Sequence, residues 1–169
     1  SVSSNPGMSV YRNVQREIEQ IAGRINGRFA TLSGQPLLLF TRALPFEELV
    51  AYYRCADVCW ITPLRDGMNL VAKEYVAARL GMGGALVLSE FTGAAVELSS
   101  AVLTNPYSTR AMDAAIDEAL DMPKDEQLRR MDVMWESVEK YDSAHWAKHI
   151  VSRFALPLKT IDPTRIAAE

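Results

Sequence analysis

The order of apolar and polar positions along the chain predicts alternating helices and strands. Apolar residues recur every three or four positions from Val10 to Ile25, with charged residues between them, which predicts an amphipathic helix ending near Gly27. Four short apolar runs instead suit strands that are covered on both faces of a sheet. They span residues 37–40, 58–61, 85–88 and 101–103.

Helical patterns fill the intervals between these runs. Pro45 suits the start of a second helix, and residues 69–80 form a third that a glycine-rich stretch ends. Three more helices follow the last strand, the final two divided near Asp142. Alternating elements with short links predict an α/β fold, in which helices cover a parallel sheet joined by right-handed crossovers. We expect residues 1–154 to form one domain and residues 155–169, which hold two prolines, to be a weakly ordered tail.

Composition and charge narrow the classes of partner. A chain of 169 residues with 49% hydrophobic residues has room for one compact domain. Its 18 basic and 21 acidic side chains give a net charge of −3, which argues against a nucleic-acid partner. The sequence contains neither an apolar run long enough for a membrane span nor a signal peptide. These features predict a soluble, cytoplasmic protein without membrane contact.

Several residues of types that can act in catalysis or metal binding have structural explanations instead. We expect Cys55 and Cys59 to be buried, inert thiols, since no cationic cluster accompanies them. His145 and His149 have the spacing of a zinc pair, but no glutamate lies between them, so we expect no metal site there. The helical spacing of Trp146 predicts a place in the core.

The loop after the apolar run at 58–61 is the strongest candidate for a binding site. Ligands of open α/β sheets bind at the carboxyl ends of the strands. This loop leads into a helix whose first amides, at about 68–71, have no intrahelical partner and could bind a phosphate or diphosphate. Gly67 would let a ligand approach the backbone, and the carboxylates of Asp66 and Glu74 could accept hydrogen bonds from sugar hydroxyls.

A structural explanation of the same loop remains open at this point. Asp66 or Asn69 could simply cap the helix, and Glu74 could be a solvated surface residue. The small residues at 93–95, flanked by Glu90 and Glu97, are equally ambiguous. They suit either a close backbone approach to a ligand or a tight turn before a short helix.

A family resemblance favours the binding site. Residues 65–75, Arg-Asp-Gly-Met-Asn-Leu-Val-Ala-Lys-Glu-Tyr, resemble the nucleotide-sugar-binding segment of the trehalose-6-phosphate synthase family of retaining glycosyltransferases. Further similar stretches occur in order at 23–29, 44–58, 87–98 and 105–107. The resemblance implies the GT-B fold, in which two Rossmann-like domains face each other across a cleft. The chain is similar to most of the C-terminal domain, truncated at its N-terminal side.

The resemblance also implies roles for individual residues. Asp66 would contact the transferred sugar, Glu74 would hold the nucleotide ribose, and a neighbouring set would bind the sugar and diphosphate through its backbone. That set is Gly67, Met68, Asn69, Leu70 and Val71. Leu44 and Pro45 would lie near the base. The resemblance implies no metal and no cofactor.

The family's basic diphosphate clamp and acceptor domain would lie upstream of Ser1, so we expect this chain to be a fragment that is inactive alone and binds nucleotide weakly. Residues 4–8 lack the arginine that binds the acceptor phosphate in trehalose-6-phosphate synthases. The chain more closely resembles the branch that transfers glucose from ADP-glucose to glycerol 3-phosphate. The alternatives are transfer from UDP-glucose to glucose 6-phosphate, or a non-catalytic nucleotide-binding module.

Overall fold

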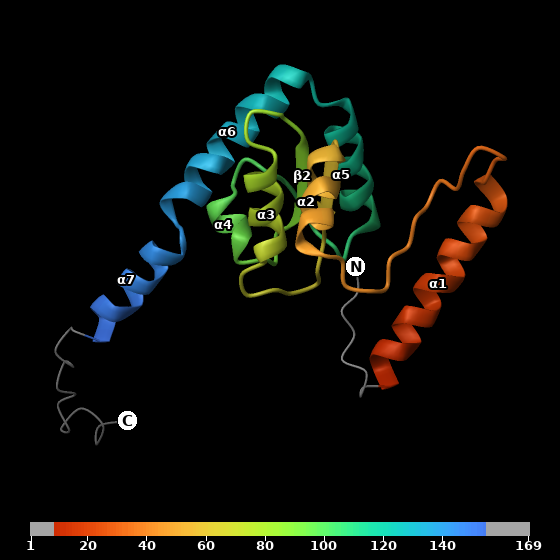
Figure 1. The fold of residues 1–169 in the computed structure, drawn as a ribbon, viewed down its shortest axis with the longest axis horizontal. Coiled ribbons are helices and arrows are strands. Elements are labelled where there is room, and N and C mark those ends of the chain that lie inside the picture. The colour runs from red at the N-terminus through yellow and green to blue at the C-terminus, as the bar shows by residue number, and fades with distance from the viewer. Residues whose placement is uncertain (1–8, 155–169) are drawn as a thin grey trace. The chain divides into compact units, whose positions relative to one another are not determined.

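The computed structural model describes residues 9–154, and the predicted tail at 155–169 and the segment before residue 9 lie outside the described residues (Figure 1). The chain divides into two units at Leu49 and Val50. The first unit contains α1 (Ser9–Phe29) and an irregular segment that leads to α2 (Phe46–Cys55), a helix that continues into the second unit. The single-domain organisation of residues 1–154 stays a prediction.

The strand expected at residues 37–40 is wrong, because these residues are irregular and Leu38 is 68% exposed. The side chain of Asn26, near the end of α1, forms hydrogen bonds with the backbone of Leu37 instead. Asn26 Nδ2 donates to the Leu37 carbonyl at 2.9 Å, and Asn26 Oδ1 accepts from the Leu37 amide at 3.1 Å. The amide side chain thus provides both hydrogen bonds that a neighbouring strand would make at this residue.

The second unit is built on a parallel sheet of three strands, as the apolar runs predict. The strands are β1 (Val58–Ile61), β2 (Ala85–Ser89) and β3 (Val102–Thr104), in the spatial order β1-β2-β3. All five residues of the central strand are buried. A strand covered on both faces must be apolar throughout, and this explains the continuous Ala-Leu-Val-Leu run.

Helices cover both faces of this sheet, and Figure 1 shows β2 between α3 and α5. The helices after β1 are α3 (Leu70–Ala78), α4 (Ala94–Glu97), α5 (Thr109–Asp121), α6 (Lys124–Lys140) and α7 (Ser143–Phe154). One face of the sheet packs with α5 in a buried cluster formed by Ala85, Val87, Val102, Ala115, Ala119 and Met122. On the other face α3 packs against β1 and β2, and α6 packs against α3 and α4. The predicted helices and the α/β fold class are confirmed.

The expectation that both cysteines are buried is wrong for Cys55, which is exposed at the end of α2. Cys59 lies in β1 and is half-buried, and desolvation raises the pKa of its thiol to about 12. A thiol that stays protonated is a poor nucleophile, so the prediction of an inert cysteine fits this position. Within residues 9–154 no helix combines the length and the apolar character that a membrane span requires.

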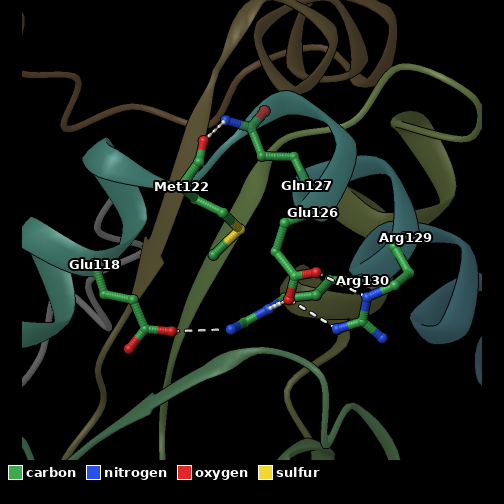
Figure 2. Close-up of polar contacts among 6 residues, drawn as sticks. All are labelled: Glu118, Met122, Glu126, Gln127, Arg129 and Arg130. Atoms are coloured by element: carbon green, nitrogen blue, oxygen red, sulfur yellow. Dashed lines mark hydrogen bonds and ion pairs between the residues drawn. The ribbon is translucent and has the colours of Figure 1, made fainter.

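A polar network joins α5 to α6 on the surface, where the chain turns between Met122 and Lys124 (Figure 2). Glu126 accepts hydrogen bonds from Arg129 and Arg130, each at 2.7 Å, and Arg130 also pairs with Glu118 at 3.1 Å. The two arginines lower the pKa of the Glu126 carboxyl to about 2. The network fixes the start of α6 relative to α5.

The segment between β2 and α4 holds the loop that follows β1. Asp66 forms a parallel bridge with Thr92, and its backbone bonds to Phe91 and Gly93 at 3.2 and 3.0 Å. The Ala94 amide donates to the Met68 carbonyl at 2.9 Å. These bonds extend the sheet pairing past the strand ends and fix the candidate loop.

Gly93 allows this contact because it has no side chain. A Cβ at Gly93 would lie 2.1 Å from the Gly67 carbonyl oxygen and 2.9 Å from its carbon. The φ of −60° and ψ of −33° at Gly93 suit any residue, so space rather than backbone conformation requires glycine. Gly93 therefore serves a close approach to the backbone of another loop, and the short helix α4 that follows it matches the tight-turn explanation of residues 93–95.

We predict that Glu126→Gln lowers stability at neutral pH and flattens its dependence on pH in the acid range. Because the native pKa lies below the ordinary 4.5, the contribution of Glu126 is present above pH 4.5 and disappears as the pH falls toward 2. Thermal unfolding between pH 2 and 7 measures the effect. Glu139→Gln on the same helix is the control, and equal acid sensitivity in both variants would contradict the prediction.

We also predict that Gly93→Ala destabilises the protein by about 1–3 kcal/mol, because a backbone carbonyl cannot move aside as a flexible side chain can. Gly23→Ala in α1 is the control, since nothing lies within 4 Å of an added Cβ there. The control should be neutral or stabilising by roughly 0.5–1 kcal/mol. Denaturant titration compares the two, and a Gly93→Ala protein as stable as the parent would show that the loops separate freely.

Candidate functional site

The Asp66 carboxylate lies in the loop at the carboxyl end of β1, where the sequence places the site. Its Oδ1 accepts from the Met68 amide and its Oδ2 from Asn69 Nδ2, both at 3.0 Å. The bond from the Met68 amide, followed by that from the Asn69 side chain, lowers the pKa of Asp66 below its ordinary value. Asp66 is therefore an ionised carboxylate of fixed orientation at neutral pH.

Asn69 caps helix α3, so the capping explanation is confirmed for this residue. Its Oδ1 accepts from the Ala72 amide at 2.9 Å, and its φ of 68° places it in the left-handed region, which asparagine tolerates better than most residues. Asp66 holds the side chain that makes this cap. The two residues form one chain of hydrogen bonds from the loop to the first turn of α3.

The first amides of α3 differ from one another in what they bind. The Met68 amide, expected to be open, is bonded to Asp66, and this expectation is wrong. Among the described residues no acceptor is recorded for the amides of Leu70 and Val71, which begin α3 and are exposed. Two open amides at the positive end of a helix dipole can bind an anion. Gly67 is exposed at the tip of the same loop.

Glu74 lies one turn further along α3 and is exposed, but it is not simply solvated. Its Oε2 accepts a hydrogen bond from Tyr53 Oη of α2 at 3.2 Å, and Tyr53 itself is only 9% exposed. A carboxylate at the surface with a buried phenol behind it is held in place while still reaching solvent.

Leu44 and Pro45 belong to the first unit and immediately precede α2. The Pro45 carbonyl accepts from the Leu49 amide at 2.9 Å and so begins the helix, as the proline predicts. Their place near a nucleotide base stays a prediction.

A groove with a volume of about 630 Å³ lies next to the loop, bordered by Met68 and Leu70 on one side and by the end of α6 and the start of α7 on the other. Trp146 lines the groove and is 57% exposed, so the prediction that it packs in the core is wrong. Lys73 and Glu97 also line it and form an ion pair at 2.5 Å that joins α3 to α4.

The pattern of the sequence does not single out Tyr53, and it indicates at residues 93–95 a close approach to a ligand or a tight turn rather than a contact with the loop after β1. Tyr53 continues the apolar stripe of α2, and its partner Glu74 lies 21 residues away. The Gly-Ala-Ala stretch signals a close approach but not its partner, which is the Gly67 carbonyl.

Comparisons with known proteins show the family of this chain. The model of "Glycosyltransferase family 20" matches residues 1–155. Glucosylglycerol-phosphate synthase of Synechocystis is 59% identical over 145 residues, which are 86% of this chain and 29% of that protein. Trehalose-6-phosphate synthase of Mycolicibacterium gilvum is 47% identical over 146 residues, again 86% of this chain and 29% of the relative.

A solved structure shares the fold. The E. coli trehalose-6-phosphate protein bound with UDP-2-fluoro glucose superposes with a TM-score of 0.83 at 42% identity, covering 89% of this chain and 34% of that chain. The chain thus spans about 29% of the length of the curated relatives it matches. The expected Rossmann-like part of a GT-B fold is confirmed. With the family model matching nearly its whole length, the chain belongs to glycosyltransferase family 20.

Proposed function

We propose that this chain forms the donor-binding part of a retaining glucosyltransferase, which transfers glucose from ADP-glucose to glycerol 3-phosphate. The observation that carries the donor assignment is the arrangement at the start of α3. There an ionised Asp66, the open amides of Leu70 and Val71, and the anchored Glu74 follow one another along one loop and helix.

Each group suits a different part of a nucleotide sugar. The open amides and the helix dipole would bind the diphosphate, whose charge the helix N-terminus favours. Asp66 would accept from hydroxyls of the transferred glucose, since a carboxylate has about four acceptor sites and the bonds from Met68 and Asn69 do not use all of them. Glu74 would accept from the ribose hydroxyls. Gly67, Met68 and Asn69 would line the path of the sugar, and Leu44 and Pro45 would face the base.

The reaction needs stabilisation of the leaving nucleoside diphosphate. As the bond between the sugar and the phosphate breaks, negative charge grows on the phosphate oxygen, and fixed amide dipoles stabilise such charge. We expect the incoming hydroxyl to approach from the face that the diphosphate leaves, with the departing phosphate accepting its proton. This course gives retention of configuration.

The choice of acceptor rests on the relatives. The Synechocystis protein named for glucosylglycerol phosphate is 59% identical to this chain, against 47% for the mycobacterial trehalose-6-phosphate synthase. A phosphorylated acceptor would bind outside this chain's described residues.

A second candidate is synthesis of trehalose 6-phosphate from UDP-glucose and glucose 6-phosphate. The observation that favours it is the E. coli structure bound with UDP-2-fluoro glucose, which this chain matches at 42% identity. Both candidates use the same donor site, and they differ in the base of the donor and in the acceptor.

We predict that the intact enzyme glucosylates glycerol 3-phosphate in preference to glucose 6-phosphate and prefers ADP-glucose to UDP-glucose. Residues 4–8 supply no arginine, and a neutral side chain does not replace a bidentate contact between arginine and phosphate. An assay that pairs both donors with both acceptors measures kcat/KM for all four combinations. Efficient formation of trehalose 6-phosphate from UDP-glucose would favour the second candidate.

We further predict different kinetic effects for Glu74→Ala and Asp66→Ala in the intact enzyme. Glu74 addresses the ribose, far from the breaking bond, so its loss should raise the donor KM roughly 10-fold or more with little change in kcat. Asp66 orients the reacting sugar, so its loss should lower kcat by on the order of 100-fold. Steady-state kinetics separate the two, and identical profiles would contradict the assigned roles.

A further inference from the structure

We propose that Tyr53 is a positioning residue for donor binding, whose phenol holds the Glu74 carboxylate in the orientation that receives the nucleotide ribose. This inference rests on the function proposed above and adds a residue from outside the donor loop. Tyr53 lies on α2 and Glu74 on α3, and the hydrogen bond of 3.2 Å between Tyr53 Oη and Glu74 Oε2 links the two helices.

The bond leaves half of the carboxylate available. Tyr53 donates to Oε2, and among the described residues no donor is recorded for Oε1 of Glu74. Glu74 is exposed, so Oε1 and the second lone pair of Oε2 can both accept from hydroxyls in solution. A ribose presents two neighbouring hydroxyls, and a carboxylate of fixed plane can accept from both.

Tyr53 is rigid enough to fix its partner. Tyr53 is 9% exposed, and its ring packs edge-on against Tyr75, with ring centroids 6.2 Å apart and an interplanar angle of 80°. Tyr75 is fully buried, and its hydroxyl donates to the Ala56 carbonyl at 3.2 Å. The phenol of Tyr53 is thus attached to the interior of the second unit.

The phenol also stays a donor at any physiological pH. Burial and, next, the negative charge of Glu74 raise the pKa of Tyr53 far above its ordinary value. A protonated phenol beside a carboxylate has one orientation that satisfies both groups, with the proton directed to Oε2.

An exposed glutamate without such a partner samples several side-chain rotamers, and binding must then order it at a cost in conformational entropy. A donor that orders the carboxylate beforehand removes part of this cost and strengthens ligand binding without touching the ligand. The benefit applies only to ligands that carry ribose hydroxyls, and this sets it apart from a general effect on the fold.

The test compares ADP and UDP with their 2′,3′-dideoxy forms by calorimetric titration of the intact protein. We expect Tyr53→Phe, which keeps the ring, to weaken binding of ADP or UDP about 3- to 10-fold, because part of the conformational entropy of the Glu74 side chain must then be lost on binding. Binding of the dideoxy forms should stay the same. In turnover the donor KM should rise while kcat changes less than about twofold.

Tyr75→Phe is the matched control. It removes a hydroxyl of the same kind from the same cluster, but one that donates to a backbone carbonyl rather than to Glu74. We expect it to lower the temperature of unfolding and to leave the ratio of the affinities for ADP and dideoxy-ADP unchanged. In the double variant Tyr53→Phe, Glu74→Ala, binding should be no weaker than with Glu74→Ala alone.

The outcomes separate this inference from the proposed function. If Glu74→Ala removes the preference for ribose hydroxyls and Tyr53→Phe does not, the positioning role is overturned while the donor site stands. If Tyr53→Phe weakens both forms of nucleotide equally, it acts through the fold and the positioning role is again overturned. If Glu74→Ala leaves the preference intact, the ribose role of Glu74 fails, and the role of Tyr53 fails with it.

Discussion

The close contact between the backbones of Gly93 and Gly67 is the constraint on which the candidate site depends. It brings the segments that follow β1 and β2 within hydrogen-bond distance, so that Asp66 bonds to Phe91 and Gly93 beyond the last paired residues of the strands. The loop is thereby an extension of the sheet rather than a free connection. A site that must receive a ligand with little reorganisation requires such support from rigid elements.

Side-chain hydrogen bonds connect this contact to the first turn of α3. Asp66, fixed by its own backbone, holds Asn69, and Asn69 caps the helix at Ala72. The cap satisfies one of the four free amides of the helix, while Leu70 and Val71 keep theirs for another acceptor. Capping by Asn69 is therefore compatible with a binding role for the loop, because the cap uses the Ala72 amide and not those of Leu70 and Val71.

The sequence predicts those elements whose causes are local. Apolar runs identify the three strands, helical periodicity identifies the long helices, and the loop at 65–74 follows from its position after a strand. The prediction fails at residues 37–40, where Asn26 takes the place of a strand neighbour, and at Trp146, which faces a groove. The partners of Tyr53 and Gly93 escape prediction because they are distant in sequence.

The two carboxylates of the candidate site have different supports. Asp66 depends on the segment after β2 through backbone bonds, whereas Glu74 depends on α2 through a buried phenol. The two supports meet in α3, because Asp66 holds the Asn69 side chain that caps the helix carrying Glu74. Effects of residues that share a hydrogen-bond network are not expected to add. A change at Tyr53 would therefore reach Glu74 without breaking a bond that Asp66 makes in its loop, whereas a change at Gly93 would reach both carboxylates.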